Sequence, residues 1–100
     1  MSAYVVFVRE QTIDADEMAV YAQKAPAARK GHDVTRLAFY GPFEVLEGPP
    51  MEGAVILRFP DMAAAREWYG SAAYQEALAH RLKGAVYRVF LVEGSDVPAR

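Results

Sequence analysis

The sequence has no cysteine, no excess of basic residues and no long apolar run, and each absence excludes a class of protein. Without cysteine, this 100-residue chain forms no disulfide and no thiolate metal site. Its formal net charge of -2 at pH 7 leaves no bulk basic surface for nucleic acid or acidic membranes. Its apolar runs have the length of strands, well short of the roughly 20 residues of a membrane helix. We therefore expect neither a nucleic-acid partner nor a membrane partner.

The N-terminus also lacks a targeting pattern. The stretch MSAYVVFVRE has neither the basic start nor the long apolar segment of a signal peptide. By default this predicts a cytoplasmic protein.

Motifs for cofactors and metals are missing as well. The chain contains no phosphate loop, no dinucleotide fingerprint and no H-x-x-x-H pair, so we expect no cofactor and no metal. The catalytic residues are unknown. As a general base, His32 with Asp33 beside it is the better candidate, because His80 shares a helical face with Glu76 and should be exposed to solvent. Ser71 is explained as a helix N-cap rather than as a nucleophile.

The residues that are present predict one domain over residues 1–94 and a polar C-terminal tail over residues 95–100. Stretches rich in β-branched and aromatic residues predict strands at 3–9, 34–40, 54–60 and 85–93. Between 41 and 53, prolines and glycines predict a long loop that carries a short edge strand at 43–47.

Two helical segments separate these strands, and the second one is interrupted. The first is expected over residues 14–31, with Asp14 and Glu17 as a capping-box pair and with Pro26 bending or splitting the helix. The second begins after Asp61, ends at Gly70 and restarts at Ser71.

The resulting order is β-α-β-β-α-β, which is the ferredoxin-like pattern of an α+β fold. Right-handed crossovers place both helices on one face of an antiparallel sheet. The strands are nevertheless apolar on both of their faces, as Ala54, Val55, Ile56 and Leu57 illustrate. A second copy of the sheet is the simplest cover for the face without helices, so the pattern predicts a homodimer.

Several stretches resemble the uncharacterised domain family numbered 1330, within the dimeric α+β barrel superfamily. They are AYVVFVR at the start, VLEG at 45–48, VILRFPDMAAAREWYGSAAYQ at 55–75 and LVEG at 91–94. The run from Trp68 to Tyr74 is the most specific of these matches. The chain departs from the family pattern at Ala72, where a proline is common, and at Gly31-His32-Asp33, where the turn is usually richer in glycine. The resemblance implies a ferredoxin-like fold and a dimeric barrel, and no reaction.

Strand alternation selects the candidate binding residues. If Leu37, Phe39 and Leu57 face the helices, the opposite parity collects Arg36, Tyr40, Arg58 and Arg88 on the other face. Arg36 and Arg58 on neighbouring strands would bind a small anion, or else pair with glutamates such as Glu44 and Glu47. Tyr69 and Tyr74 are expected either at the wall of a ligand pocket or in the core with their hydroxyls satisfied.

Three functions are compatible with these residues. The first is a dimeric protein that binds a small anionic or aromatic molecule in a pocket of the barrel. The second is a cofactor-independent enzyme of the monooxygenase or isomerase type, which the superfamily resemblance implies by fold alone. The third is a structural or regulatory dimer without a ligand. An enzyme should have a titratable group inside its concave pocket, whereas a binding protein needs only the pocket.

Overall fold

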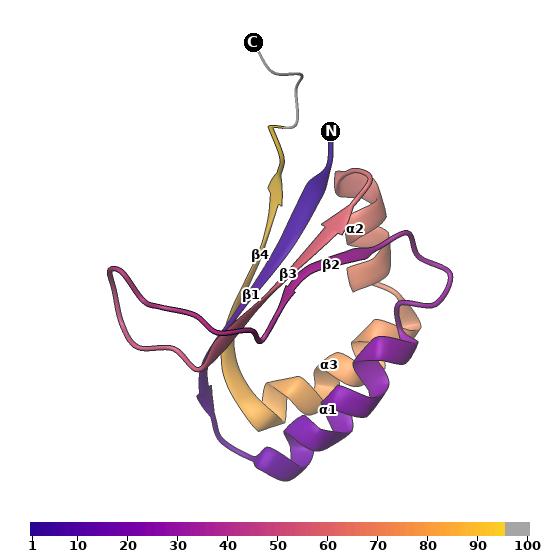
Figure 1. The fold of residues 1–100 in the computed structure, drawn as a ribbon. Helices are drawn as coiled ribbons and strands as arrows, with labels where there is room; N and C mark the ends of the chain where they lie inside the picture. The colour runs from indigo at the N-terminus through magenta and orange to yellow at the C-terminus, as the bar shows by residue number, and fades with distance from the viewer. Residues whose placement is uncertain (96–100) are drawn as a thin grey trace.

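The computed structural model describes residues 1–95 and consists of a four-stranded sheet with helices on one side (Figure 1). The elements are β1 (Ala3–Thr12), α1 (Ala15–Ala27), β2 (Thr35–Phe39), β3 (Gly53–Phe59), α2 (Met62–Tyr69), α3 (Ala72–Gly84) and β4 (Ala85–Glu93). Of the predicted polar tail, residues 96–100 lie outside the described residues. Within the described residues, none of the helices has the length and apolarity needed to cross a membrane.

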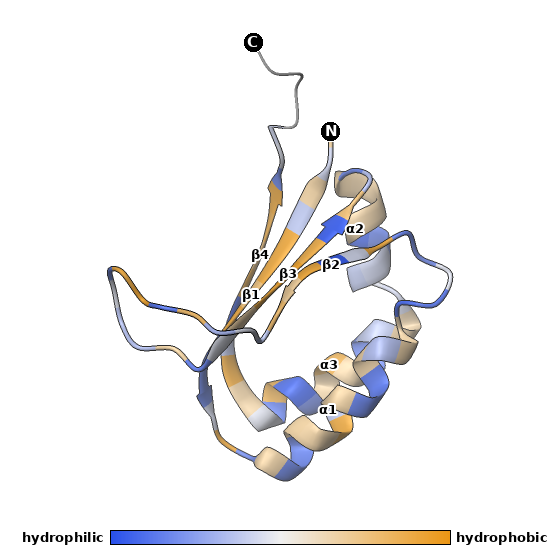
Figure 2. Ribbon diagram, viewed as in Figure 1, coloured by the Kyte–Doolittle hydropathy of each residue, from blue (hydrophilic) through white to orange (hydrophobic). Residues whose placement is uncertain are grey.

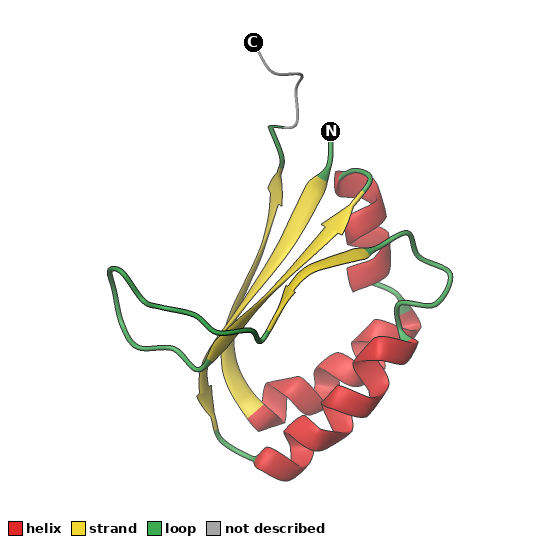
Figure 3. Ribbon diagram, viewed as in Figure 1, coloured by secondary structure: helices red, strands yellow, loops and turns green. Residues whose placement is uncertain are grey.

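The strand order is β2-β3-β1-β4, and every neighbouring pair is antiparallel. This order and the helices on a single face confirm the predicted ferredoxin-like α+β architecture (Figure 3). The loop between β2 and β3 projects away from the sheet, and its residues 43–47 form no strand, so the prediction of an edge strand there is wrong.

The strands are largely apolar (Figure 2), and their pairing places apolar rows on both faces of the sheet. On the helix face, Val5 and Phe7 of β1 lie beside Leu57 and Val55 of β3, and all four are buried. On the opposite face, which we call the open face, Val6 lies between Ile56 and Phe90. Phe90 remains 47% exposed, because no helix covers this face.

The start of α1 follows the sequence prediction only in part. Asp14 is the N-cap, and its Oδ1 accepts hydrogen bonds from the backbone N–H groups of Asp16 and Glu17. The Glu17 carboxylate does not complete a capping box. Its Oε2 lies 2.7 Å from Nδ1 of His80 on α3, so His80 is half-buried rather than exposed as predicted.

The end of α1 also differs from the prediction. Pro26 lies in the last turn of α1, which ends one residue later, so the helix stops at Ala27 instead of continuing to residue 31 and is not split. The turn that follows uses Gly31 with a φ of 80°.

The predicted break between α2 and α3 is confirmed. Gly70 is the C-cap of α2, and its N–H donates to the carbonyl of Arg66. Ser71 is the N-cap of α3. Its Oγ accepts from the N–H of Tyr74 and donates to the carbonyl of Trp68 at 2.7 Å. The break lies between Trp68 and Tyr74, and both of these residues are buried in the core.

Helix α1 packs mainly against α3 rather than directly on the sheet. Helix α2 is the one that contacts β1, β3 and β4. None of the residues of α1 is buried, although one of its faces is apolar. The space between this face and the sheet is where the candidate site lies.

Candidate functional site

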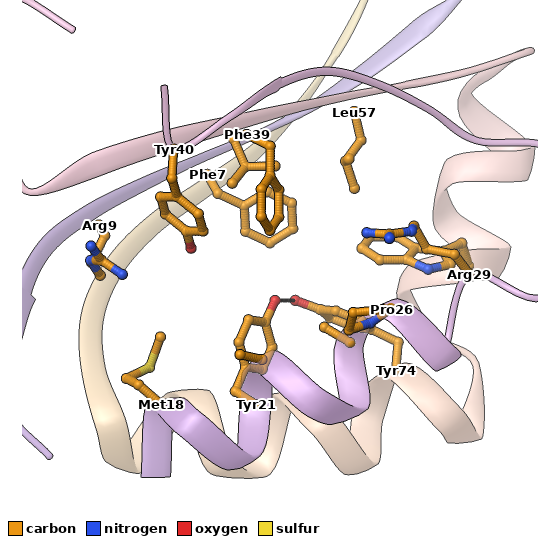
Figure 4. Close-up of a pocket in the computed structure, with 14 residues that line it drawn as sticks. Phe7, Arg9, Met18, Tyr21, Pro26, Arg29, Phe39, Tyr40, Leu57 and Tyr74 are labelled. Atoms are coloured by element: carbon orange, nitrogen blue, oxygen red, sulfur yellow. Dashed lines mark hydrogen bonds between the residues drawn. The ribbon is translucent and has the colours of Figure 1, made fainter. Parts of the chain in front are cut away.

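A cavity of about 120 Å³ separates α1 from the helix face of the sheet (Figure 4). Its lining comes from three strands, β1 to β3, and from all three helices, with Arg29 just beyond the end of α1 and Tyr40 just beyond the end of β2. The lining residues are Phe7, Arg9, Met18, Tyr21, Ala22, Ala25, Pro26, Arg29, Phe39, Tyr40, Val55, Leu57, Trp68 and Tyr74. Most of the lining side chains are aliphatic or aromatic, and the polar groups among them are tyrosine hydroxyls and arginine guanidiniums. Its size is comparable to the roughly 150 Å³ apolar cavity that accepts a benzene ring.

An irregularity in β2 forms the wall on the sheet side. Arg36 pairs with Leu57 and Ala38 pairs with Ile56, so the register shifts by one residue at Leu37. Paired residues in an antiparallel sheet point to the same face. Arg36 therefore shares the helix face with Leu57, and Phe39, paired with Val55, enters the lining.

Tyr40 reaches the same face through a strained backbone. Its φ is 50°, which is unusual for a residue with a side chain. Its ring lies over Gly53, where an added Cβ would stand 2.8 Å from Cδ1 of Tyr40, so only glycine leaves room for the ring. The hydroxyl of Tyr40 is hydrogen-bonded to that of Tyr87, and Figure 4 shows it pointing into the cavity.

A second pair of tyrosines closes the helix side of the cavity. The hydroxyls of Tyr21 on α1 and Tyr74 on α3 are 2.8 Å apart, and the two rings meet edge to face (Figure 4). Tyr74 also packs on Trp68, with ring centroids 4.2 Å apart. The polar tips thus satisfy each other, while the rings give the cavity an apolar wall.

Arg81 lies beneath this wall and was not singled out as a site residue from the sequence. It is 4% exposed, its Nε has no hydrogen-bond partner, and its guanidinium carbon is 4.8 Å from the ring centroid of Tyr87. The rings of Phe7 and Tyr21 lie within 6 Å of it. A cation among aromatic faces is stabilised by their quadrupoles. The spacing of Tyr74, Leu78 and Arg81 places Arg81 on the buried face of α3, and this was the available sequence signal.

Burial raises the pKa of Tyr21 and Tyr40, and for each the hydrogen bond to another tyrosine adds to the effect. Burial also raises the pKa of Tyr74, although its hydrogen bond with Tyr21 and the charge of Arg81 act in the opposite direction. The three phenols therefore stay protonated at neutral pH and present hydroxyls, not phenolates, to the cavity.

These tyrosines predict a loss of stability at alkaline pH. Above a pH of about 10 the unfolded chain releases phenol protons that the folded chain retains, so stability present below that pH falls as pH rises. Each retained proton contributes a slope of about 1.4 kcal/mol per pH unit. We expect Tyr21→Phe to reduce this slope by about one proton, measured by urea unfolding between about pH 9.5 and 11.5. An unchanged slope would show that Tyr21 ionises equally in both states.

The structure separates the residues that the sequence predicted to form one site. Tyr40 and Tyr74 line the cavity, whereas Tyr69 lines a wider groove of about 320 Å³ between α2 and β4. The prediction that Arg36 and Arg58 share a face is wrong, because Arg58 pairs with Thr35 on the open face. Tyr40 was predicted on the face of Arg58 and lies on the other.

The remaining candidates lie elsewhere. His32 is half-buried in the turn after α1, where its N–H donates to the carbonyl of Arg29, and it does not line the cavity. Glu44 and Glu47 take part in none of the ion pairs found among residues 1–95, so the predicted alternative of arginines neutralised by these glutamates is not seen within these residues. In the same residues no cluster of acidic or histidine side chains is arranged to hold a metal ion.

A family model for a domain of unknown function, DUF1330, matches residues 2–95. The chain belongs to the DUF1330 family. The match covers every element of the fold and agrees with the resemblance noted in the sequence. No curated protein matches the sequence.

Solved structures share the fold of this DUF1330 domain. A protein of unknown function from Rhodopseudomonas palustris is 18% identical with a TM-score of 0.74, covering 96% of this chain and 84% of that one. A dimeric ferredoxin-like protein of unknown function from Thermobifida fusca is 11% identical with a TM-score of 0.64, covering 92% and 90%. SnoaB, a cofactor-independent oxygenase from Streptomyces nogalater, is 13% identical with a TM-score of 0.55, covering 96% and 94%. At these identities the likeness shows the fold alone.

Proposed function

We propose that this DUF1330 protein binds a small molecule in the cavity between α1 and the sheet. The observation that carries the proposal is that α1 turns its apolar face, with Met18, Tyr21 and Ala25, toward a cavity instead of packing it on the sheet. Protein interiors are otherwise close-packed, so a lined cavity of this size is an uncommon feature. A concave, mostly apolar pocket with a few converging polar groups is typical of small-molecule sites.

Binding is favoured over catalysis by the chemistry of the lining. Among the described residues that form it there is no aspartate, glutamate or histidine, and its tyrosines hold their protons tightly. A general base within reach of a bound substrate is therefore missing from the lining. SnoaB is described as a cofactor-independent oxygenase, but no feature of this cavity favours that activity here.

We also propose that the protein is a homodimer whose open faces meet. Val86, Phe90 and Val92 on β4 are each more than 40% exposed on this face, and an apolar row crosses the sheet from Ala38 to Phe90. Burying such a row against a second copy removes apolar surface from water. The Thermobifida fusca structure with the same fold is described as dimeric, which supports the arrangement. A cytoplasmic location stays a prediction.

Filling the cavity tests the binding proposal. Ala25 lines the cavity and is half-buried, so Ala25→Phe should occupy part of its volume. We expect the melting temperature of the variant to stay within about 5 °C of wild type. We expect it to lose binding of single-ring probes such as benzyl alcohol and benzamide, measured by ligand-observed NMR.

Ala19→Phe is the matched control, because Ala19 is an exposed residue of α1 that does not line the cavity. It should bind the same probes as wild type does. If the wild type binds no probe and native mass spectrometry finds no copurified ligand, the binding proposal fails. If Ala25→Phe binds like wild type, the ligand site lies outside the cavity.

A further inference from the structure

We propose that Arg29 and Arg36 bind the acidic group of an anionic ligand whose small, flat apolar body occupies the cavity. The ligand class is a monocarboxylic acid with about one ring. This inference rests on the proposed function, since it assigns the chemistry of the molecule that the cavity takes.

Arg29 lines one end of the cavity, and Arg36 lies next to its lining. Arg29 follows the end of α1 and lines the cavity. Arg36 is brought to the same face by the register shift in β2, and its guanidinium carbon is 4.5 Å from the ring centroid of Phe39, which is also in the lining. The stacked ring orders the Arg36 side chain without neutralising its charge.

Neither charge is compensated by an ion pair within the part of the chain that the structure describes. The ion pairs among residues 1–95 join Glu52 to Arg9, Glu76 to Lys24 and Glu17 to His80, and none includes Arg29 or Arg36. Partial burial lowers the pKa of the Arg29 guanidinium, and the charge of Arg36 lowers it further. Two like charges held close together repel, and an anion between them removes this repulsion.

The other end of the cavity is different. Figure 4 shows Arg9 on the side opposite Arg29. Arg9 stacks on the ring of Tyr40 at 4.7 Å, and its Nε lies 3.3 Å from Oε1 of Glu52. That distance is an ion pair without the geometry of a hydrogen bond, since the same Nε has no hydrogen-bond partner. Because Glu52 already neutralises Arg9, the acidic group belongs at the end with Arg29 and Arg36.

The lining between these ends determines the polarity and the size of the rest of the ligand. Leu57 and Pro26 lie on the Arg29 side of the cavity, so a carboxylate held there leaves its substituent in contact with apolar groups. Guanidiniums are planar and bind carboxylates through paired hydrogen bonds. A cavity of about 120 Å³ has room for one ring and not for a fused ring system.

The test compares benzoate with benzamide, which has the same shape and no charge. Dissociation constants are measured at pH 7 by calorimetry or NMR on the full chain. We expect wild type to bind benzoate at least about tenfold more tightly than benzamide. Arg29→Met and Arg36→Met should each weaken benzoate about tenfold and leave benzamide within about twofold. Raising the salt concentration should weaken benzoate only.

Arg58→Met is the matched control, because Arg58 is an exposed arginine on the open face and should leave both affinities unchanged. Equal affinity of wild type for the two probes overturns the inference and leaves the binding function standing. Binding of neither probe overturns both. If Arg36→Met weakens the dimer but not benzoate, the arginines serve the interface and the inference fails. If a variant unfolds, the effect of salt on benzoate binding by wild type still tests the inference. Benzoate binding that does not change with salt contradicts a carboxylate bound by arginines.

Discussion

Replacing Trp68 by alanine is expected to lower the free energy of unfolding by about 3–5 kcal/mol. Trp68 is 2% exposed, and its ring packs against those of Phe7, Phe59 and Tyr74 from three different elements. Its Nε1 has no hydrogen-bond partner, so the loss comes from packing and cavity formation rather than from a broken hydrogen bond. The measurement is urea unfolding followed by circular dichroism.

Leu82→Ala on α3 is the control for this substitution. Leu82 is 68% exposed, and its truncation should change stability by no more than about 0.5 kcal/mol. A loss below about 1 kcal/mol for Trp68→Ala would contradict the structure and show that the ring is not a core residue.

Replacing Ile56 by glutamate is expected to dissociate the proposed dimer. Ile56 occupies the middle of the open face, paired with Val6 on one side and Ala38 on the other. In a face-to-face dimer the new carboxylate would be buried without a partner, at a cost of about 3 kcal/mol or more, which is over about 100-fold in the dissociation constant. Sedimentation or light scattering at micromolar concentration should show a dimer for wild type and a monomer for the variant.

The control is Ala79→Glu, because Ala79 is an exposed residue of α3 on the side away from the open face. It should remain dimeric. Circular dichroism distinguishes a folded monomer from an unfolded chain. A dimeric Ile56→Glu protein of wild-type stability would show that the open face is not the interface.

Much of this fold could be predicted from the sequence because its signals are local. The strands follow runs of β-branched and aromatic residues, and the N-caps at Asp14, Asp61 and Ser71 each precede a helix by one residue. The break after Trp68 follows from Gly70 and Ser71 alone. The order of these elements, with right-handed crossovers, leaves few topologies other than the ferredoxin-like one. The apolar residues on both faces of the strands are equally local, and they led to the dimer proposal.

The site could not be predicted from the sequence, because the alternation of residues along a strand does not reveal a register shift or an unusual backbone angle. Side chains alternate across a strand, so the single-residue register shift at Leu37 moves Arg36 to the helix face, and the positive φ of Tyr40 does the same for its ring. Both are fixed by how β2 pairs with β3. The sequence shows an apolar face on α1 but not that α1 packs against α3 and leaves this face turned toward a cavity. The cavity follows from that packing, and the position of Arg36 beside it follows from the pairing of β2 with β3, since segments distant in sequence meet only when the chain folds.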